Sequence, residues 1–170
     1  IRDEVVREFR LGYAGEGWRT LRNYFDKKQI PLTTVEQAGL IVSRTEADAE
    51  GDFYDRFRGR LIFPIEDVTG RVLAFGGRIL GNGEPKYLNS PESPVFSKGR
   101  NLYGLNRSKE DIRRKGYAIL VEGYFDMISL WSAGITNVLA TMGTALTKEQ
   151  VELLRRYTEN VTVLFDPDEA

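Results

Sequence analysis

The segment YAILVEGYFD, residues 117–126, decides the fold of this chain. Its apolar run Tyr117–Val121 is typical of a buried strand, and that strand ends at Glu122. Gly123 predicts a turn, and residues 125–133 have the apolar spacing of a helix. The segment therefore predicts a strand that leads directly into a helix, with an acidic residue at the junction.

The residues after this segment predict two more strands, 135–140 and 161–165. Between them Thr147–Gln150 is a capping box, which predicts the start of a helix. Strands that alternate with helices indicate a parallel sheet with right-handed crossover connections. We therefore expect an α/β fold in which residues 117–170 form part of a parallel β-α-β-α-β sheet.

Four carboxylates are expected at one edge of this sheet. Glu122 ends the first strand, and Asp126 lies in the first turn of the following helix. Asp166 and Asp168 follow the third strand. Ligands bind outside the carboxyl ends of parallel strands, so these four residues are the predicted catalytic site. Carboxylates about 4 Å apart repel by roughly 4 kcal/mol at an effective dielectric of 20, and a divalent cation removes that penalty.

The ligand type predicts the metal. Hard oxygen donors favour Mg²⁺ or Mn²⁺, and we expect Glu122, Asp166 and Asp168 to bind it. Taken alone, an aspartate at the end of a strand more commonly caps a helix or forms a turn. Asp126 in particular stands where a helix cap is expected.

The first half of the chain predicts a mixture of helices and strands. Residues 1–50 have helical spacing interrupted by glycines, and residues 53–80 predict strands. The strand expected at Arg60–Pro64 contains a proline, which favours an edge strand or a bulge. These residues therefore predict a mixed α+β subdomain before the parallel sheet.

A long loop and a charged helix are expected before the parallel sheet. Residues 81–104 are rich in Gly, Asn, Pro and Ser, and a loop of this length in a compact domain is usually functional or disordered. Ser108 is the expected cap of a helix through Lys115. At Gly116 the pattern changes from a mixture of helices and strands to regularly alternating strands and helices. This predicts a subdomain of residues 1–116 and a second subdomain of residues 117–170.

The composition excludes several classes of site. The chain has 170 residues, 24 Lys plus Arg, 25 Asp plus Glu and a formal net charge of -1, with no cysteine and no histidine. This excludes a disulfide scaffold, the usual zinc site and a serine–histidine triad within the chain, so any metal must be held by oxygen. No run of 18 apolar residues predicts a membrane span. The absence of cysteine fits a reducing compartment.

Positive charge gathers in the middle of the chain. Residues 51–116 carry 13 basic and 8 acidic side chains, whereas residues 117–170 carry 3 basic and 8 acidic ones. This asymmetry suggests two functions, the binding of an anion and the binding of a cation. The residues expected to contact nucleic acid are Arg58, Arg60, Arg78, Lys86, Tyr87 and Lys98.

The spacing of these residues suggests how they act. Alternation along a strand predicts Arg58 and Arg60 on one face. The glycine pair before Arg78 would let a phosphate backbone approach. Tyr87 beside Lys86 would let a base stack next to a cation. Taken singly, each cation is also compatible with a solvated surface side chain.

Several motifs resemble known families. Glu122-Gly-Tyr-Phe-Asp126 with Asp166-Pro-Asp168 resembles the Toprim fold, which primases, type IA and II topoisomerases and some nucleases share. Five upstream motifs are similar to bacterial replication primases and occur in the order of that family. They are FRGRLIFPI (57–65), FGGR (75–78), PKYLNSPE (85–92), FSKGR (96–100) and LYGL (102–105).

The resemblance implies an activity and its partners. It implies the catalytic core of a cytoplasmic enzyme that makes short RNA primers on single-stranded DNA, by metal-assisted nucleotidyl transfer from ribonucleoside triphosphates. The basic residues would grip the template or the RNA–DNA hybrid. We expect the chain to be a piece of a longer protein, without that family's zinc-binding module and without its module for the replicative helicase. Alone, it is expected to be weakly active or inactive.

One departure and two alternatives accompany this interpretation. Pro167 stands where the family usually has glycine, which removes an N–H but keeps both aspartates. A Toprim enzyme that cleaves nucleic acid, such as a topoisomerase or a nuclease, has the same carboxylates. A non-enzymatic nucleic-acid binding module would keep the basic residues and show no metal dependence.

Overall fold

The computed structural model describes residues 2–44, 52–143 and 145–165. The chain divides into two compact units, which are described separately. The parallel-sheet unit comprises Ile1–Phe9, Ile65–Leu73 and Pro94–Ala170. The antiparallel unit comprises Arg10–Pro64 and Ala74–Ser93.

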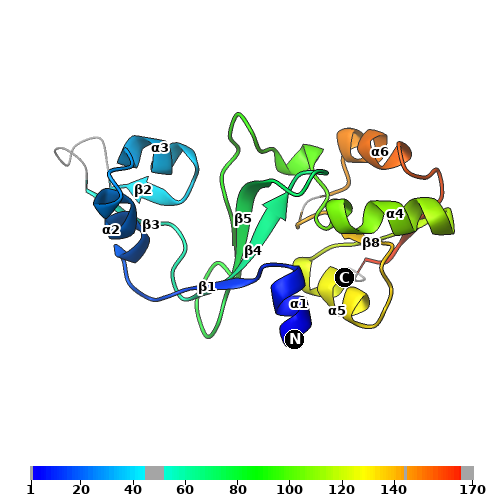
Figure 1. Cartoon of the computed structure of the whole chain (residues 1–170), viewed down its shortest axis with the longest axis horizontal. Helices are drawn as coiled ribbons and strands as arrows, with labels where there is room; N and C mark the ends of the chain where they lie inside the picture. Colours follow the sequence, from blue (N-terminus) through cyan, green and yellow to red (C-terminus); the bar gives the residue numbers. More distant parts are fainter. Residues whose placement is uncertain (1, 45–51, 144, 166–170) are drawn as a thin grey trace. The chain divides into compact units, whose positions relative to one another are not determined.

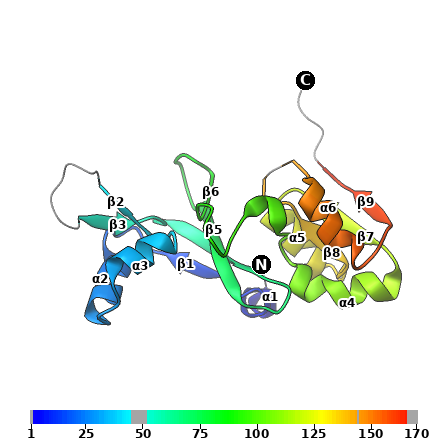
Figure 2. The ribbon, with the colours of Figure 1, turned by 90° about the horizontal axis from the view of Figure 1, so that it is seen from above.

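The parallel-sheet unit contains the predicted β-α-β-α-β arrangement (Figure 2). Its strands are β7 (Ala118–Val121), β8 (Val138–Ala140) and β9 (Val161–Val163), in the order β8-β7-β9. Both strand pairs are parallel. Helix α5 (Tyr124–Ser132) joins β7 to β8, and α6 (Lys148–Arg155) joins β8 to β9. The expected α/β fold is therefore confirmed.

Helices cover both faces of this sheet. Helices α4 (Leu105–Lys115) and α6 lie on one side of β8, and α5 lies on the other (Figure 1). Alternate residues of β7 face α4 and α6, as expected for a strand buried on both sides. The core on the α4 and α6 side consists of Leu102, Leu105, Ile112, Ala118, Leu120, Leu139 and Leu154.

Helix α1 (Asp3–Glu8) is held to this unit by an aromatic residue and an arginine. The ring of Phe9, which is buried, lies 6.2 Å from that of Tyr103 and 5.7 Å from that of Trp131. Arg107 stacks on Phe9 at 4.9 Å and donates two hydrogen bonds to the Glu8 carbonyl. These contacts give the short helix the tertiary support that its length requires.

A buried ion pair lies beside α1. The guanidinium of Arg107 pairs with the carboxylate of Glu66, whose side chain is 3% exposed. Asn106 donates a second hydrogen bond to the same carboxylate, at 2.9 Å. The charge is buried with a partner and a further donor, which is the condition under which a carboxylate is tolerated inside a protein.

The antiparallel unit is built around a sheet of order β1-β4-β5-β6. Its strands are β1 (Gly12–Ala14), β4 (Arg60–Glu66), β5 (Val72–Ile79) and β6 (Tyr87–Asn89). The far ends of β4 and β5, with their predicted turn, are grouped with the parallel-sheet unit. The turn is closed by a hydrogen bond from Asp67 N to Arg71 O at 2.9 Å.

A smaller layer completes the antiparallel unit. Helices α2 (Thr20–Lys27) and α3 (Leu32–Gln37) pack with the two-stranded sheet of β2 (Ile41–Ser43) and β3 (Phe53–Asp55). The buried carboxylate of Asp55 accepts hydrogen bonds from the first backbone N–H groups of α2, at 2.7 and 2.8 Å. Asp55 therefore supplies the cap that α2 lacks within its own sequence.

Three local predictions were wrong. Helix α4 begins at Leu105, so Ser108 lies inside the helix and not at its cap. The Ser108 side chain is fully buried, and its hydroxyl donates to the Val138 carbonyl at 2.6 Å. Of the two alternatives given for the strand that contains Pro64, the edge position was wrong, because β4 lies between β1 and β5. Its pairing with β1 ends at Ile62, so Pro64 interrupts no hydrogen bond with β1.

The third wrong prediction concerns the long loop. Within residues 81–104 the chain forms the strand β6 and the short 3₁₀ helix η1 (Lys98–Arg100). The predicted boundary at Gly116 stays a prediction. None of the helices in the described part of the chain is long and apolar enough to cross a membrane.

Candidate functional site

Glu122 lies at the carboxyl end of the central strand of the parallel sheet. It follows β7 directly and is half-buried. Its carbonyl accepts hydrogen bonds from the backbone N–H groups of Met142 (3.1 Å) and Gly143 (3.2 Å). The segment after β8 therefore fixes the backbone at Glu122.

Asp126 lies one helical turn further on and is exposed. Its Oδ2 atom accepts a hydrogen bond from the backbone N–H of Gly123 at 3.1 Å, in the manner of a capping box. The helix-cap interpretation of Asp126 is therefore confirmed. That hydrogen bond occupies one of its two carboxylate oxygens.

Glu122 and Asp126 both line a hollow of about 250 Å³. The end of β9 is held beside β7 by a hydrogen bond from Leu164 N to Leu120 O at 2.8 Å. The ends of two parallel strands and the first turn of α5 thus share one cavity. It is lined by Val121, Glu122, Asp126, Ser129, Leu130 and Leu164.

The other two predicted acidic residues, Asp166 and Asp168, lie outside the described residues. Within residues 2–44, 52–143 and 145–165, no group of three or more acidic, histidine or cysteine side chains could hold a metal. The carboxylates of Glu122 and Asp126 beside a hollow are hard oxygen donors, so the described part of the site is compatible with a divalent cation that prefers oxygen ligands.

Arg58 does not share a strand face with Arg60, and that prediction was wrong. The strand β4 begins at Arg60, and Gly59 has a φ of +59°, which ends the alternation that the prediction assumed. The guanidinium of Arg58 lies 4.0 Å from the ring of Trp18 and 5.2 Å from that of Tyr54. Arg58 therefore presents its charge together with two aromatic faces.

Arg60 is buried, with 5% of its surface exposed. It donates a hydrogen bond to the Lys86 carbonyl at 3.4 Å. Burial, and next the nearby charge of Arg58, lower the pKa of Arg60. A Cβ atom at Gly77 would lie 2.8 Å from Phe57 and 3.1 Å from Arg60, so this glycine makes room for internal packing.

Arg78, Lys86 and Tyr87 lie together on the β5–β6 hairpin. Arg78 is paired with Tyr87 across the two strands, and its guanidinium lies 5.8 Å from the tyrosine ring. Lys86 is exposed, and Tyr87 is 40% exposed. A hollow of about 420 Å³ is lined by Lys86 and residues 78–84. The structure therefore brings a cation pair and an exposed ring to one surface.

Lys98 belongs to the other unit. It lies in η1, half-buried, and its carbonyl accepts a hydrogen bond from Gln150 Nε2 at 2.9 Å. Of the six residues predicted to contact nucleic acid, the other five are in the antiparallel unit.

Three residues of the antiparallel unit, Trp18, Tyr54 and Arg56, lie near Arg58 or β6 and were not predicted from the sequence. Trp18 is 54% exposed, and its ring lies 5.6 Å from that of Tyr54. Arg56 donates two hydrogen bonds to the Asn89 carbonyl, and burial lowers its pKa. An exposed tryptophan beside glycine was the available signal; the placement of Tyr54 and Arg56 depends on long-range packing.

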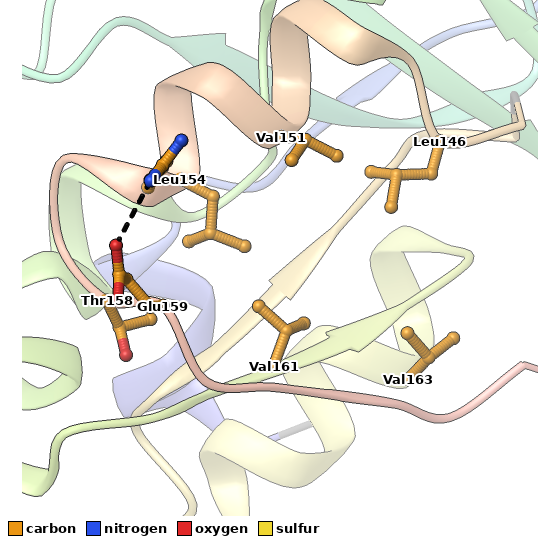
Figure 3. Close-up of a pocket in the computed structure, with 8 residues that line it drawn as sticks. Leu146, Val151, Leu154, Thr158, Glu159, Val161 and Val163 are labelled. Atoms are coloured by element: carbon orange, nitrogen blue, oxygen red, sulfur yellow. Dashed lines mark hydrogen bonds and ion pairs between the residues drawn. The ribbon is translucent and has the colours of Figure 1, made fainter.

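A larger hollow, of about 440 Å³, lies between α6 and β9 and is mainly apolar (Figure 3). Leu146, Val151 and Leu154 face Val161 and Val163 across it. Its charged lining residues, Arg155 and Glu159, form an ion pair at 3.3 Å. This hollow does not include Glu122 or Asp126, so it lacks the carboxylates expected of the catalytic site.

Comparison with known proteins agrees with both halves of the chain. The family model described as DNA primase catalytic core, N-terminal domain, matches residues 1–109, and a Toprim-like model matches residues 119–170. A DNA primase of Halalkalibacterium halodurans is 46% identical over 167 residues, which is 98% of this chain and 27% of that protein.

Solved structures agree as well. The zinc-binding and RNA polymerase domains of the Aquifex aeolicus primase superpose with a TM-score of 0.88 at 44% identity, over 98% of this chain and 40% of that one. A DnaG primase catalytic domain bound to single-stranded DNA gives 0.86 at 41% identity, over 98% and 53%. The chain spans about a quarter of the length of the curated relatives that it matches. This chain belongs to the family of DNA primase catalytic cores, with a Toprim-like region after the N-terminal domain.

Proposed function

We propose that this chain is part of the catalytic core of a bacterial replication primase, which makes short RNA primers on single-stranded DNA. The observation that carries the proposal is the hollow that Glu122 and Asp126 share at the carboxyl end of the parallel sheet. In a chain of this family, an acidic hollow at that place is suited to metal-assisted nucleotidyl transfer.

The acidic residues would hold the metal. We assign Glu122, Asp166 and Asp168 as ligands of Mg²⁺ or Mn²⁺, with Asp126 beside them. When bound, the cation supplies Lewis-acid stabilisation of negative charge on the triphosphate. The hydrogen bonds from Met142 and Gly143 keep the Glu122 backbone in place, so little backbone freedom would be lost when its carboxylate binds a metal.

The proposed reaction joins two ribonucleotides. The oxygen of a 3′-hydroxyl forms a bond to the α-phosphorus of an incoming ribonucleoside triphosphate, while the bond from that phosphorus to the leaving pyrophosphate breaks. The hydroxyl proton passes to Glu122 or to solvent. The chain contains no histidine, so an imidazole base within it is excluded.

The exposed and half-buried cations would hold the template or the RNA–DNA hybrid. We propose phosphate contacts for Arg58, Arg78, Lys86 and Lys98, and base stacking for Tyr87. Trp18 and Tyr54 extend the stacking surface at Arg58. Because Arg60 is buried against the Lys86 carbonyl, we propose that it supports the backbone that carries Lys86 and does not itself reach a phosphate.

The partners of the whole protein follow from the family. We propose ribonucleoside triphosphates and single-stranded DNA as ligands of the core, cytoplasmic activity, and contact with the replicative helicase through a module outside this sequence. The zinc-binding module would likewise lie outside it.

A single incubation tests the proposal. The full-length protein is mixed with single-stranded DNA and labelled ribonucleoside triphosphates, with Mg²⁺, with Mn²⁺ or with a chelator. We expect new RNA that depends on both the template and the metal. Cut DNA would instead indicate a topoisomerase or nuclease. Template binding with neither product would indicate a binding module.

A further inference from the structure

We propose that Gln150 and Thr147 are positioning residues that hold the loop of Lys98 at the catalytic end of the parallel sheet. The loop comprises residues 97–101 and is called the Lys98 loop. The inference rests on the proposed function, in which Lys98 contacts a phosphate of the template. It assigns to the start of α6 a role in template binding besides that of a helix terminus.

The side chain of Gln150 is fully buried and makes hydrogen bonds in two directions. Its Oε1 accepts from the backbone N–H of Thr147 at 3.1 Å, which completes the capping box of α6. Its Nε2 donates to the carbonyls of Lys98 and Asn101, each at 2.9 Å. A glutamate would complete the same capping box, but it has no donor for the two carbonyls.

Thr147 also contacts both elements. Its Oγ1 accepts from the backbone N–H of Gln150 at 3.1 Å and donates to the Gly99 carbonyl at 2.5 Å. Within the loop, Asn101 Nδ2 donates to the Ser97 carbonyl at 2.7 Å. Three carbonyl groups of the loop, those of Lys98, Gly99 and Asn101, therefore accept hydrogen bonds from side chains at the start of α6.

The chain after the loop is attached to the sheet at a second place. Tyr103 exchanges two backbone hydrogen bonds with Ala140, the last residue of β8, at 2.9 and 3.1 Å. Shortly after Ala140, the backbone N–H groups of Met142 and Gly143 donate to the carbonyl of Glu122. The Lys98 loop is thus tied to the same end of the sheet that carries Glu122.

These attachments have a consequence for binding. A lysine on a mobile loop loses backbone freedom when it contacts a phosphate, in addition to the freedom of its own side chain. A loop that is already held by buried hydrogen bonds loses only the second part. Loss of the Gln150 donors should therefore weaken the contact of Lys98 while the charge itself remains.

A double-mutant cycle in the full-length protein tests this inference. The variants are Gln150→Met, which removes the donors without adding a charge, Lys98→Ala and the two together. The measurement is the dissociation constant for single-stranded DNA at several salt concentrations. Loss of one phosphate contact should flatten the salt slope by roughly 0.7, which corresponds to about fivefold weaker binding at 0.1 M salt. We expect this fivefold loss of affinity for Lys98→Ala, a loss of affinity of up to the same size for Gln150→Met, and no further loss in the double variant.

Matched controls separate positioning from stability. Ser108→Ala removes another hydroxyl that is fully buried in the same unit and that donates to the Val138 carbonyl, so it should lower stability without changing the salt slope. If Gln150→Met does not fold, Thr147→Val replaces it. That variant should weaken binding, and Thr147→Ser, which restores the hydroxyl, should reverse the effect.

Two results would overturn the inference. In the first, Lys98→Ala weakens binding, but Gln150→Met leaves the dissociation constant unchanged or adds its full effect in the Lys98→Ala background. In the second, Lys98→Ala itself leaves binding unchanged, which removes Lys98 from the template contacts. The proposed synthesis of RNA is tested separately by the products of the incubation described above. Failure of the Lys98 inference would therefore not contradict the proposed function.

Discussion

Two neighbouring cations, Lys86 and Arg60, should differ sharply in their contribution to template binding. Lys86 is exposed, whereas Arg60 is 5% exposed and donates to the Lys86 carbonyl. A cation that reaches the solvent can displace a counterion from single-stranded DNA, which contributes roughly -0.7 to the slope of log K against log salt, whereas a buried cation cannot. We therefore expect Lys86→Met to flatten the slope by about 0.7 and Arg60→Met to leave it unchanged.

The same argument gives the total for this set of residues. Five cations predicted from the sequence would contribute a slope of about -3.5, and the burial of Arg60 reduces this to about -2.8. The assay is a titration of the full-length protein with single-stranded DNA at several salt concentrations without metal. Each methionine variant keeps an unbranched side chain and removes the charge, so the pair is matched.

The result that refutes this reasoning is specific. If Arg60→Met flattens the slope as much as Lys86→Met while the protein remains folded, Arg60 reaches a phosphate in the complex. The burial seen in the free protein would then not describe the bound state. Equal slopes for all three proteins would show that Lys86 is not a contact either.

Three other predictions follow from the described contacts. Arg107→Met should lower the free energy of unfolding by about 3–5 kcal/mol, because it leaves Glu66 buried without a cation. Arg113→Met, on the surface, should change that free energy by less than about 0.5 kcal/mol. Urea unfolding measures both variants, and equal effects would contradict the ion-pair argument. Burial raises the pKa of Tyr103, and its buried hydroxyl has no hydrogen-bond partner within the described residues. Tyr103→Phe should therefore raise the free energy of unfolding by about 1 kcal/mol in the same assay. A decrease of more than about 1 kcal/mol would show that the hydroxyl has a partner. Tyr87→Ala should cost about 1–3 kcal/mol of template affinity with an unchanged salt slope, and a changed slope would show that it does not act by stacking.

The parallel sheet could be predicted from the sequence because its signals are local. The apolar run before Glu122, the turn at Gly123 and the capping box at Thr147–Gln150 each depend on a few adjacent residues, and all three are found in the structure. Their order then fixes the carboxyl edge of the sheet, since parallel strands all end on one side. The proximity of Glu122 and Asp126 follows from that edge.

The fate of the polar residues could not be predicted in the same way. Serine is a residue type that commonly caps helices, yet the hydroxyl of Ser108 donates a hydrogen bond to the carbonyl of Val138, 30 positions away. Arg60 is buried by packing against residues 26 positions later. Local sequence does not show which polar groups will meet a distant partner, so burial of single cations appeared only in the structure.

The central claim is that Glu122 belongs to a metal site that supports RNA synthesis. The most direct measurement compares Glu122→Gln with Glu110→Gln, an exposed acidic residue on α4, in the full-length protein. Mn²⁺ binding, template-dependent RNA synthesis and the unfolding temperature are measured for each. We predict that Glu122→Gln abolishes synthesis and weakens Mn²⁺ binding with little change in unfolding temperature, and that Glu110→Gln changes neither activity nor binding. RNA synthesis at the normal rate by Glu122→Gln would contradict the account.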